Sequence, residues 1–264
     1  VSPAVPKILK FGGGVETSGL VCEMIERGER CDAVIFADTG AERDYTLENV
    51  AKMDVLMRVH GWPGITTVYY TTRDGERLTL EQHSLNHSRM PSKSYGMKSC
   101  SIRFKHEPSD KWINHWPPAR ACWDAGEKPV MLIGYNVDEV RRWTAAPASD
   151  GRFVYDYPLV RWKIGREEAA AAAARFGIYP RKSACYFCGS ARPREVLRLR
   201  QDAPDLFMRG VAIEDKARPF SGSIEGLGMN FSWRELATAD AAQVRLFGEQ
   251  PMPMPCECSE GEDD

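Results

Sequence analysis

Three consecutive glycines separate a short apolar segment from a stretch with helical spacing, in Phe11-Gly-Gly-Gly-Val-Glu-Thr-Ser18. Glycines let the backbone approach an anion closely, and the N-terminus of the following helix offers unpaired N–H groups and a positive dipole end. The pattern is neither a Walker loop nor the spaced dinucleotide fingerprint. It predicts a phosphate or pyrophosphate cradle, or else a plain strand–helix turn. The cradle would comprise Gly12, Gly13, Gly14, Glu16, Thr17 and Ser18.

A second group of reactive residues is Cys185-Tyr-Phe-Cys188, whose spacing is typical of a metal site or a redox dithiol. Because no thioredoxin-like context surrounds it, we favour a metal. Zn²⁺ is one candidate, since His83 and His87 lie four positions apart and would share one helix face, which could complete a tetrahedral site. An iron–sulfur cluster is the other.

Charged residues follow two further apolar runs. Asp38 comes directly after Ala33-Val-Ile-Phe-Ala37 and could hold Mg²⁺ or a ribose hydroxyl, or cap a helix. Glu42 could contact a ligand or be a solvated charge at a helix start. After Val130-Met-Leu-Ile-Gly134, the forked donors of Arg141 and Arg142 suit phosphate or sulfate oxygens.

Basic residues also cluster around the cysteine pair. Arg181 and Lys182 precede it, and Arg194 and Arg198 follow at a helical spacing of four. The whole patch, Arg192, Arg194, Arg198 and Arg200, could steer a phosphate backbone or could be a solvated helix face.

Four segments, in this order, resemble the PP-loop (N-type) ATP pyrophosphatases and their phosphoadenylylsulfate reductase branch. The glycine loop is similar to the family's Ser-Gly-Gly-x-Asp-Ser signature. Phe36-Ala-Asp-Thr-Gly-Ala-Glu42 resembles a Phe-x-Asp-Thr-Gly-x-Glu strand end, and Gly134 to Arg142 resembles Gly-x-x-x-Asp-Glu-x-x-Arg. Tyr157-Pro-Leu159 with Trp162 resembles Tyr-Pro-Leu-x-x-Trp. The likeness extends over residues 7–200.

The resemblance implies a bound adenine nucleotide, ATP or an adenylylsulfate, with Mg²⁺. Its contacts would be the glycine loop and Asp38, Thr39, Gly40, Glu42, Gly134 and Arg142. The loop departs from the family pattern, however, because Val15 stands at its lysine-like position and Glu16 at its aspartate. Lys105 or Arg141 could supply the lost positive charge, and we assign both, with Asp38, to catalysis.

The segment Lys98-Ser-Cys-Ser-Ile-Arg-Phe-Lys105 is similar to a Cys-Ser/Thr-x-x-x-Lys segment of cluster-bearing relatives. The resemblance therefore implies a [4Fe-4S] cluster on Cys100, Cys185 and Cys188. Three thiolates leave one iron open to sulfide, substrate or a fourth ligand, for which Cys122, Cys256 and Cys258 are candidates.

The implied activity is ATP-dependent adenylation of an acceptor followed by sulfur transfer, as in nucleic-acid thiolation or phosphorothioation. Implied partners are a cysteine desulfurase or other sulfur donor, and tRNA or DNA at the Arg192–Arg200 patch. One alternative is a thiol-dependent sulfonucleotide reductase, although the tail Cys256-Glu-Cys258 lacks the Glu-Cys-Gly-x-His pattern of such enzymes. Another is a catalytically degenerate nucleotide- or nucleic-acid-binding module with structural zinc.

The elements that must position these residues alternate between strand and helix. Strands are predicted at 7–11, 33–37, 66–70 and 130–134, and helices at 17–27, 45–60, 167–176 and 193–200. This order predicts an α/β, Rossmann-like, mainly parallel sheet with helices on both faces. We expect a nucleotide-binding domain at 1–200, a helical C-terminal extension at 201–249 and a disordered acidic tail at 250–264.

Composition sets outer limits. The 264 residues carry a net charge of −2, so the chain as a whole gives no electrostatic case for nucleic acid. No apolar run approaches the roughly 20 residues of a membrane span, and Val1 to Lys10 has no signal-peptide apolar region. We therefore expect a cytoplasmic protein whose eight cysteines are reduced or bind metal.

Overall fold

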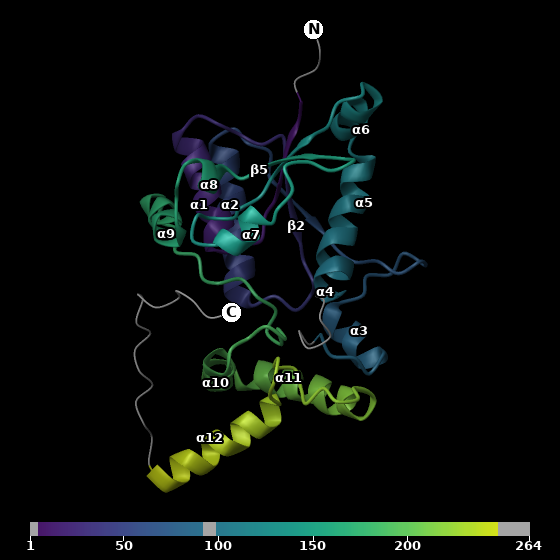
Figure 1. The fold of residues 1–264 in the computed structure, drawn as a ribbon, viewed down its shortest axis with the longest axis vertical. Coiled ribbons are helices and arrows are strands. Elements are labelled where there is room, and N and C mark those ends of the chain that lie inside the picture. The colour runs from purple at the N-terminus through teal and green to yellow at the C-terminus, as the bar shows by residue number, and fades with distance from the viewer. Residues whose placement is uncertain (1–4, 92–98, 248–264) are drawn as a thin grey trace.

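The computed structural model describes residues 5–91 and 99–247. Its centre is a parallel sheet with the strand order β3-β2-β1-β4-β5 (Figure 1). The strands are β1 Lys7–Lys10, β2 Ala33–Ala37, β3 Ile65–Val68, β4 Val130–Leu132 and β5 Val154–Asp156. Leu9 lies in register with Val34 on one side and Leu132 on the other. The predicted α/β fold with a parallel sheet is confirmed.

The central strands are buried on both faces, as their continuous apolar sequences predict. All five residues of β2 are buried. Val34 and Phe36 belong to a core cluster with α1, Val15–Glu26, and α9, Arg166–Arg175. Their neighbours Ala33, Ile35 and Ala37 face a second cluster, which includes side chains of α5, Glu107–His115, and α6, Pro117–Asp124. Figure 1 shows α1, α2 (Asp44–Val59) and α9 on one side of the sheet and α5 and α6 on the other.

The alanine run of α9 allows a very close contact with α1. Ala169, Ala172 and Ala173 are fully buried, and a β-carbon on Gly19 would lie only 2.3 Å from the Ala169 carbonyl oxygen. Small residues on both helices therefore let the two backbones meet.

The polar middle of the chain forms short helices that lead to α5 and α6. They are α3 Leu80–Asn86, α4 Ser99–Ser101 and a π-helical turn, Ile102–His106. Two further short helices, α7 Val140–Thr144 and α8 Pro158–Arg161, connect β4, β5 and α9. Helix α5 covers a face of the sheet, where its Ile113 is fully buried.

Beyond the sheet lies a separate helical layer. It contains α10 Pro193–Asp202, α11 Pro204–Ala217, a 3₁₀ turn Arg218–Phe220 and α12 Trp233–Phe247. The layer has its own apolar cluster, formed by side chains such as Phe187, Leu199, Phe207 and Trp233. Residue 200, the predicted domain boundary, lies within α10, and the predicted tail at 250–264 is outside the described residues.

Most predicted boundaries differ from the observed ones by a few residues. Strand β3 ends at Val68 and β4 at Leu132, short of the predicted ends, and the three-residue β5 was not predicted. Helix α1 begins at Val15 because Gly14 takes the N-cap position. Among residues 5–91 and 99–247, no helix is long and apolar enough to cross a membrane.

Candidate functional site

The glycine loop lies between β1 and α1, at the carboxyl edge of the sheet. Gly13 has a φ of +72°, and the γ-methyl of Thr46 lies 2.9 Å from where a β-carbon would be, so only glycine fits there. From α2, Asp44–Val59, the Asn49 side-chain amide donates to the Gly13 carbonyl at 3.0 Å and to Ser18 Oγ at 2.9 Å. Helix α2 therefore fixes the conformation of the loop.

The strand order reverses between β1 and β4, and open parallel sheets bind ligands at such a switch point. Here the end of β4 approaches the glycine loop, because a β-carbon on Gly134 would lie 3.0 Å from the Thr17 methyl. A cavity of about 1140 Å³ opens at this place. The predicted site residues that line it are Gly12, Gly14, Glu16, Thr17, Thr39, Cys100, Lys105, Gly134, Arg142, Cys185 and Cys188.

A buried ion pair joins two of the segments around the cavity. The Glu42 side chain is fully buried and pairs with Lys105 Nζ at 3.1 Å, while Thr39 Oγ1 donates to the same carboxylate at 3.1 Å. The π-helical turn at Ile102–His106, a geometry frequent at functional sites, carries Lys105. Burial works to lower the pKa of Lys105, but the attraction of Glu42 and then of Cys185 outweighs it and raises that pKa. Lys105 therefore stays charged.

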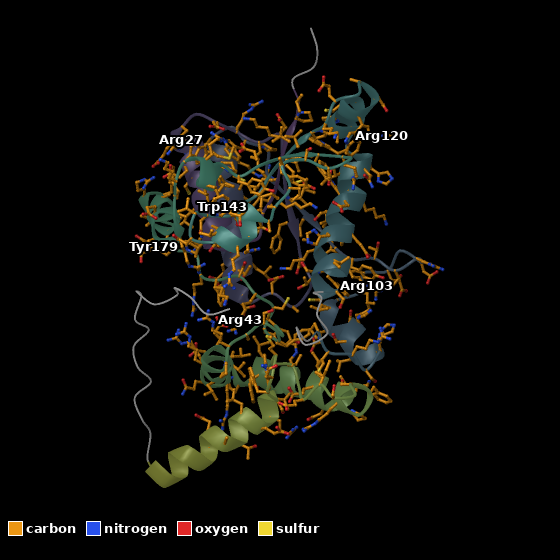
Figure 2. All side chains as sticks on the ribbon, viewed as in Figure 1. Arg27, Arg43, Arg103, Arg120, Trp143 and Tyr179 are labelled. Atoms are coloured by element: carbon orange, nitrogen blue, oxygen red, sulfur yellow. The ribbon has the colours of Figure 1, made fainter. Side chains whose placement is uncertain are left out.

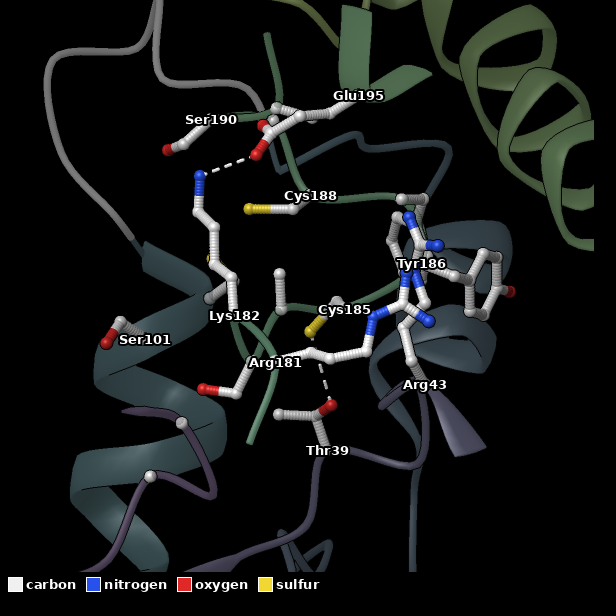
Figure 3. A pocket seen from close by; sticks show the side chains of 18 of the residues that line it. Thr39, Arg43, Ser101, Arg181, Lys182, Cys185, Tyr186, Cys188, Ser190 and Glu195 are labelled. Atoms are coloured by element: carbon white, nitrogen blue, oxygen red, sulfur yellow. Dashed lines mark hydrogen bonds and ion pairs between the residues drawn. The ribbon is translucent and has the colours of Figure 1, made fainter. Parts of the chain in front are cut away.

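The cysteines lie beside this ion pair. Cys185 Sγ is 3.4 Å from Thr39 Oγ1 and donates to the Glu42 carboxylate at 3.9 Å, and the backbones of Glu42 and Cys185 form an isolated antiparallel bridge. Figure 3 shows Cys185 and Cys188 on the cavity wall above Thr39. Burial, and after it the charge of Glu42, raises the pKa of Cys185 to about 12. Burial and then Cys188 also raise the pKa of Cys100. Without a metal, these two thiols are protonated at neutral pH.

The positions of the histidine and cysteine side chains distinguish between the two metal centres expected from the sequence, Zn²⁺ and an iron–sulfur cluster. The His83 and His87 rings stack on each other with centroids 4.4 Å apart, and His83 Nε2 is 2.7 Å from a guanidinium nitrogen of Arg103. In the part of the chain that the structure describes, no three His, Cys, Asp or Glu side chains are grouped closely enough to hold a single ion. The predicted zinc site of two histidines and two cysteines is therefore wrong.

An iron–sulfur cluster places different demands on its ligands. A four-iron cube is larger than one ion and keeps its thiolates farther apart, with cysteines as the usual ligands. Cys100, Cys185 and Cys188 all line one large cavity, and Lys105 lines it with them. Three thiols and one cation around such a space fit this group. Cys122 is buried in α6 and does not line the cavity, so it is no fourth ligand, and Cys256 and Cys258 lie outside the described residues.

Several predicted residues do not line the cavity. Asp38 accepts from the Gly40 amide at 2.7 Å and from Arg77 at 2.9 Å, so both of its carboxylate oxygens have partners within the fold. Its expected role toward Mg²⁺, ribose or catalysis stays a prediction. Gly40 packs against Thr79 with a φ of +70°. Arg141 is exposed on α7 and does not line the cavity, and its expected catalytic role stays a prediction. Gly13, Ser18 and Glu42 do not line the cavity either. They contact Asn49 or Lys105 and so hold the segments that form its wall.

The basic patch of the sequence is divided by the fold. Arg194 and Arg198 line the cavity, whereas Arg200 pairs with Asp240 at 3.1 Å and donates to the Ala237 carbonyl of α12. Arg192 is the N-cap residue of α10 and is exposed.

Four further lining residues carry polar chemistry that the sequence did not reveal: Lys10, Arg43, Tyr45 and Arg166. Lys10 pairs with Asp110, and Arg166 pairs with Glu16 of the glycine loop. Arg43 and Tyr45 follow Glu42 directly, which is the only local signal that could have found them.

No known family model matches the chain, and no curated protein sequence matches it. Among solved structures, it is similar to the U34-tRNA thiolase NcsA from Methanococcus maripaludis with its [4Fe-4S] cluster. The identity is 13%, the TM-score is 0.41, and the match covers 83% of this chain and 73% of that one. A likeness of this size says nothing about activity.

Proposed function

We propose that the chain is a nucleotide-dependent enzyme that activates an acceptor oxygen by adenylation and then replaces that oxygen with sulfur. One observation carries the proposal: a single cavity joins a glycine loop at the switch point of the sheet to three cysteines and a lysine. A phosphate cradle and a thiol cluster that share a cavity can act on the same substrate in sequence.

The glycine loop and the start of α1 would hold the phosphates of ATP, which enters with Mg²⁺. The N–H groups of the first turn and the positive end of the helix favour an anion there. Thr17 lines the cavity, and its hydroxyl oxygen lies 3.5 Å from the Gly14 carbonyl, within the loop itself. The wall at Gly134 lies close to the loop and confines a ligand between β1 and β4.

In the first step, the acceptor oxygen attacks the α-phosphorus of ATP, the bond to the bridging oxygen breaks, and pyrophosphate leaves. In the second, hydrosulfide attacks the atom that carried that oxygen, and AMP leaves with the original oxygen. A persulfide donor, for example one loaded by a cysteine desulfurase, needs in addition a two-electron thiol reductant to release its sulfur as hydrosulfide. A cluster bound to Cys100, Cys185 and Cys188 would supply an iron with an open position for sulfide. Lys105 offsets the negative charge that the thiolates and Glu42 bring together.

The cysteines provide the first test. Protein purified without oxygen should contain iron and sulfide and show a broad band near about 400 nm. Cys185→Ala should lose iron, sulfide and band, whereas the matched control Cys122→Ala, at a buried cysteine outside the cavity, should keep them. Wild-type protein without iron, or iron retained in the Cys185 variant, would overturn the assignment of the cluster.

The reaction is tested separately. With ATP, a sulfide source and an acceptor, the enzyme should release AMP and pyrophosphate in equal amounts. Release of sulfite from an adenylylsulfate, without ATP cleavage, would show a sulfonucleotide reductase instead.

A further inference from the structure

The first turn of α2 lies directly against the glycine loop. The Thr46 methyl closes the space beside Gly13, and Asn49 holds the Gly13 carbonyl. The N-termini of α1 and α2 therefore meet at the same wall of the cavity. Because the N-terminus of a helix carries a partial positive charge, two such ends at one place favour an anion more than one does.

A second segment reaches the loop from far along the chain. Ser183 Oγ lies 2.9 Å from the position of a β-carbon on Gly14, and the Tyr45 hydroxyl donates to the Lys182 carbonyl at 3.1 Å. These contacts bring residues 181–183 beside the glycine loop and fix the Tyr45 ring between the two segments.

Tyr45 holds two guanidinium groups. The Arg181 guanidinium carbon is 4.6 Å from the centre of its ring and that of Arg43 is 5.9 Å from it, both within range for a cation–π contact. The two positive charges therefore lie within about 10 Å of each other, which is the screening length at roughly 0.1 M salt. Figure 3 shows Arg43 and Arg181 reaching the same part of the cavity.

These two arginines differ from most basic groups of the lining, and they share with Arg198 of α10 the lack of an ion pair to a carboxylate of the described residues. Lys182 pairs with Glu195, Arg142 with Glu139 and Arg166 with Glu16. Within residues 5–91 and 99–247, neither Arg43 nor Arg181 makes an ion pair with a carboxylate. In the same part of the chain, Arg43 Nε and Thr46 Oγ1 are buried without a hydrogen-bond partner. Unpaired charge and unsatisfied polar atoms together indicate that a ligand completes this wall.

We propose that Arg43 and Arg181 bind the phosphates of the nucleotide held by the glycine loop and supply the positive charge that Val15 leaves out. Their planar forks suit phosphate oxygens. Tyr45 acts through them, as a positioning residue. The inference rests on the proposed binding of a nucleotide but is independent of sulfur transfer.

The test is the dependence of binding on the number of phosphates. Equilibrium binding of ATP, AMP and adenosine is measured calorimetrically for wild type, Arg43→Gln, Arg181→Gln and the double variant. Each single substitution should weaken ATP binding about tenfold, as expected for one charged hydrogen-bonding group. AMP binding should weaken less and adenosine binding should not change. Arg120→Gln is the matched control, because Arg120 is exposed on α6, far from Arg43 in Figure 2.

Three results would overturn the inference. The first is an unchanged affinity for ATP in the double variant, and the second is an equal loss of affinity for ATP and for adenosine. The third is a loss of affinity for a labelled single-stranded oligonucleotide while the affinity for ATP stays unchanged. Arg181→Lys, which keeps the charge and loses the fork, should recover part of the ATP affinity and guards against misfolding. Wild-type protein that binds no ATP would refute nucleotide binding and this inference together. ATP binding that depends on the arginines, without sulfur transfer, would refute only the reaction.

Discussion

Glu42 is a fully buried carboxylate, and Lys105, whose side chain is 37% exposed, is the cation that reaches it. Removing one partner of such a pair leaves a charge that water cannot solvate. We therefore expect Lys105→Met to lower the free energy of unfolding by about 2 kcal/mol, less than for a fully buried pair because solvent screens the lysine.

The double variant Glu42→Gln/Lys105→Met measures how much of the loss in unfolding free energy comes from the interaction between the two side chains. Urea denaturation of the two single variants and the double should show that the second substitution recovers part of the loss. Losses that simply add would contradict a coupled pair.

At the scale of residues, sequence patterns identified candidate site residues that lie close together in the sequence, within one short motif. The glycine loop and the cysteine pair are each contained in one short segment, and residues of both line one cavity. The patterns failed where the partner is distant in sequence. Asp38 accepts a hydrogen bond from Arg77, 39 positions away. The His83 ring lies in hydrogen-bond contact with Arg103, 20 positions away. No local pattern reveals such partners.

At the scale of the elements, the contact between α1 and α9 depends on Gly19 of α1, which has no side chain. In an exposed helix, replacing glycine by alanine stabilises by up to about 1 kcal/mol. At Gly19 the added carbon would meet the backbone of Ala169, which cannot move aside cheaply. We expect Gly19→Ala to destabilise the protein by about 2 kcal/mol.

Thermal unfolding monitored by circular dichroism measures this effect. Ala171→Val on the exposed face of α9 is the control and should change the midpoint little. A Gly19→Ala variant as stable as wild type would show that the two helices can separate without loss.

Sequence also predicted the main strands and helices, because their apolar periodicity is long enough to read. Strand β5 has only three residues, with Val154 exposed, and therefore leaves no pattern. The π-helical turn that presents Lys105 was equally unpredictable, since it differs from an α-helix in hydrogen bonding and not in composition.

At the scale of the whole molecule, the cavity lies between the sheet and the C-terminal helical layer, and Leu199 and Trp233 of that layer line it. One buried carboxylate organises the layer. Glu214 accepts from the backbone amides of Leu227, Trp233 and Arg234 and from Ser232 Oγ, at distances from 2.6 to 3.2 Å. It thereby caps α12 from a neighbouring helix.

Glu214→Gln replaces one accepting oxygen by a donor that faces other donors. We expect a loss of about 2 kcal/mol in the free energy of unfolding and weaker ATP binding, because the far wall of the cavity loosens. Urea denaturation and calorimetry measure the two effects. The control is Glu235→Gln, at an exposed ion pair with Arg218 that should contribute little. Lower stability with unchanged ATP affinity would show that the layer does not shape the site.

The backbone bridge between Glu42 and Cys185 joins the segment after β2 to the cysteine pair. A ligand on the cysteines that displaces Cys185 must also displace Glu42 and, through it, Arg43 at the start of α2. Its binding free energy is then coupled to that of the nucleotide. Coupling of this kind is reciprocal, so whatever factor the group on the cysteines imposes on nucleotide affinity, the nucleotide imposes on the retention of that group.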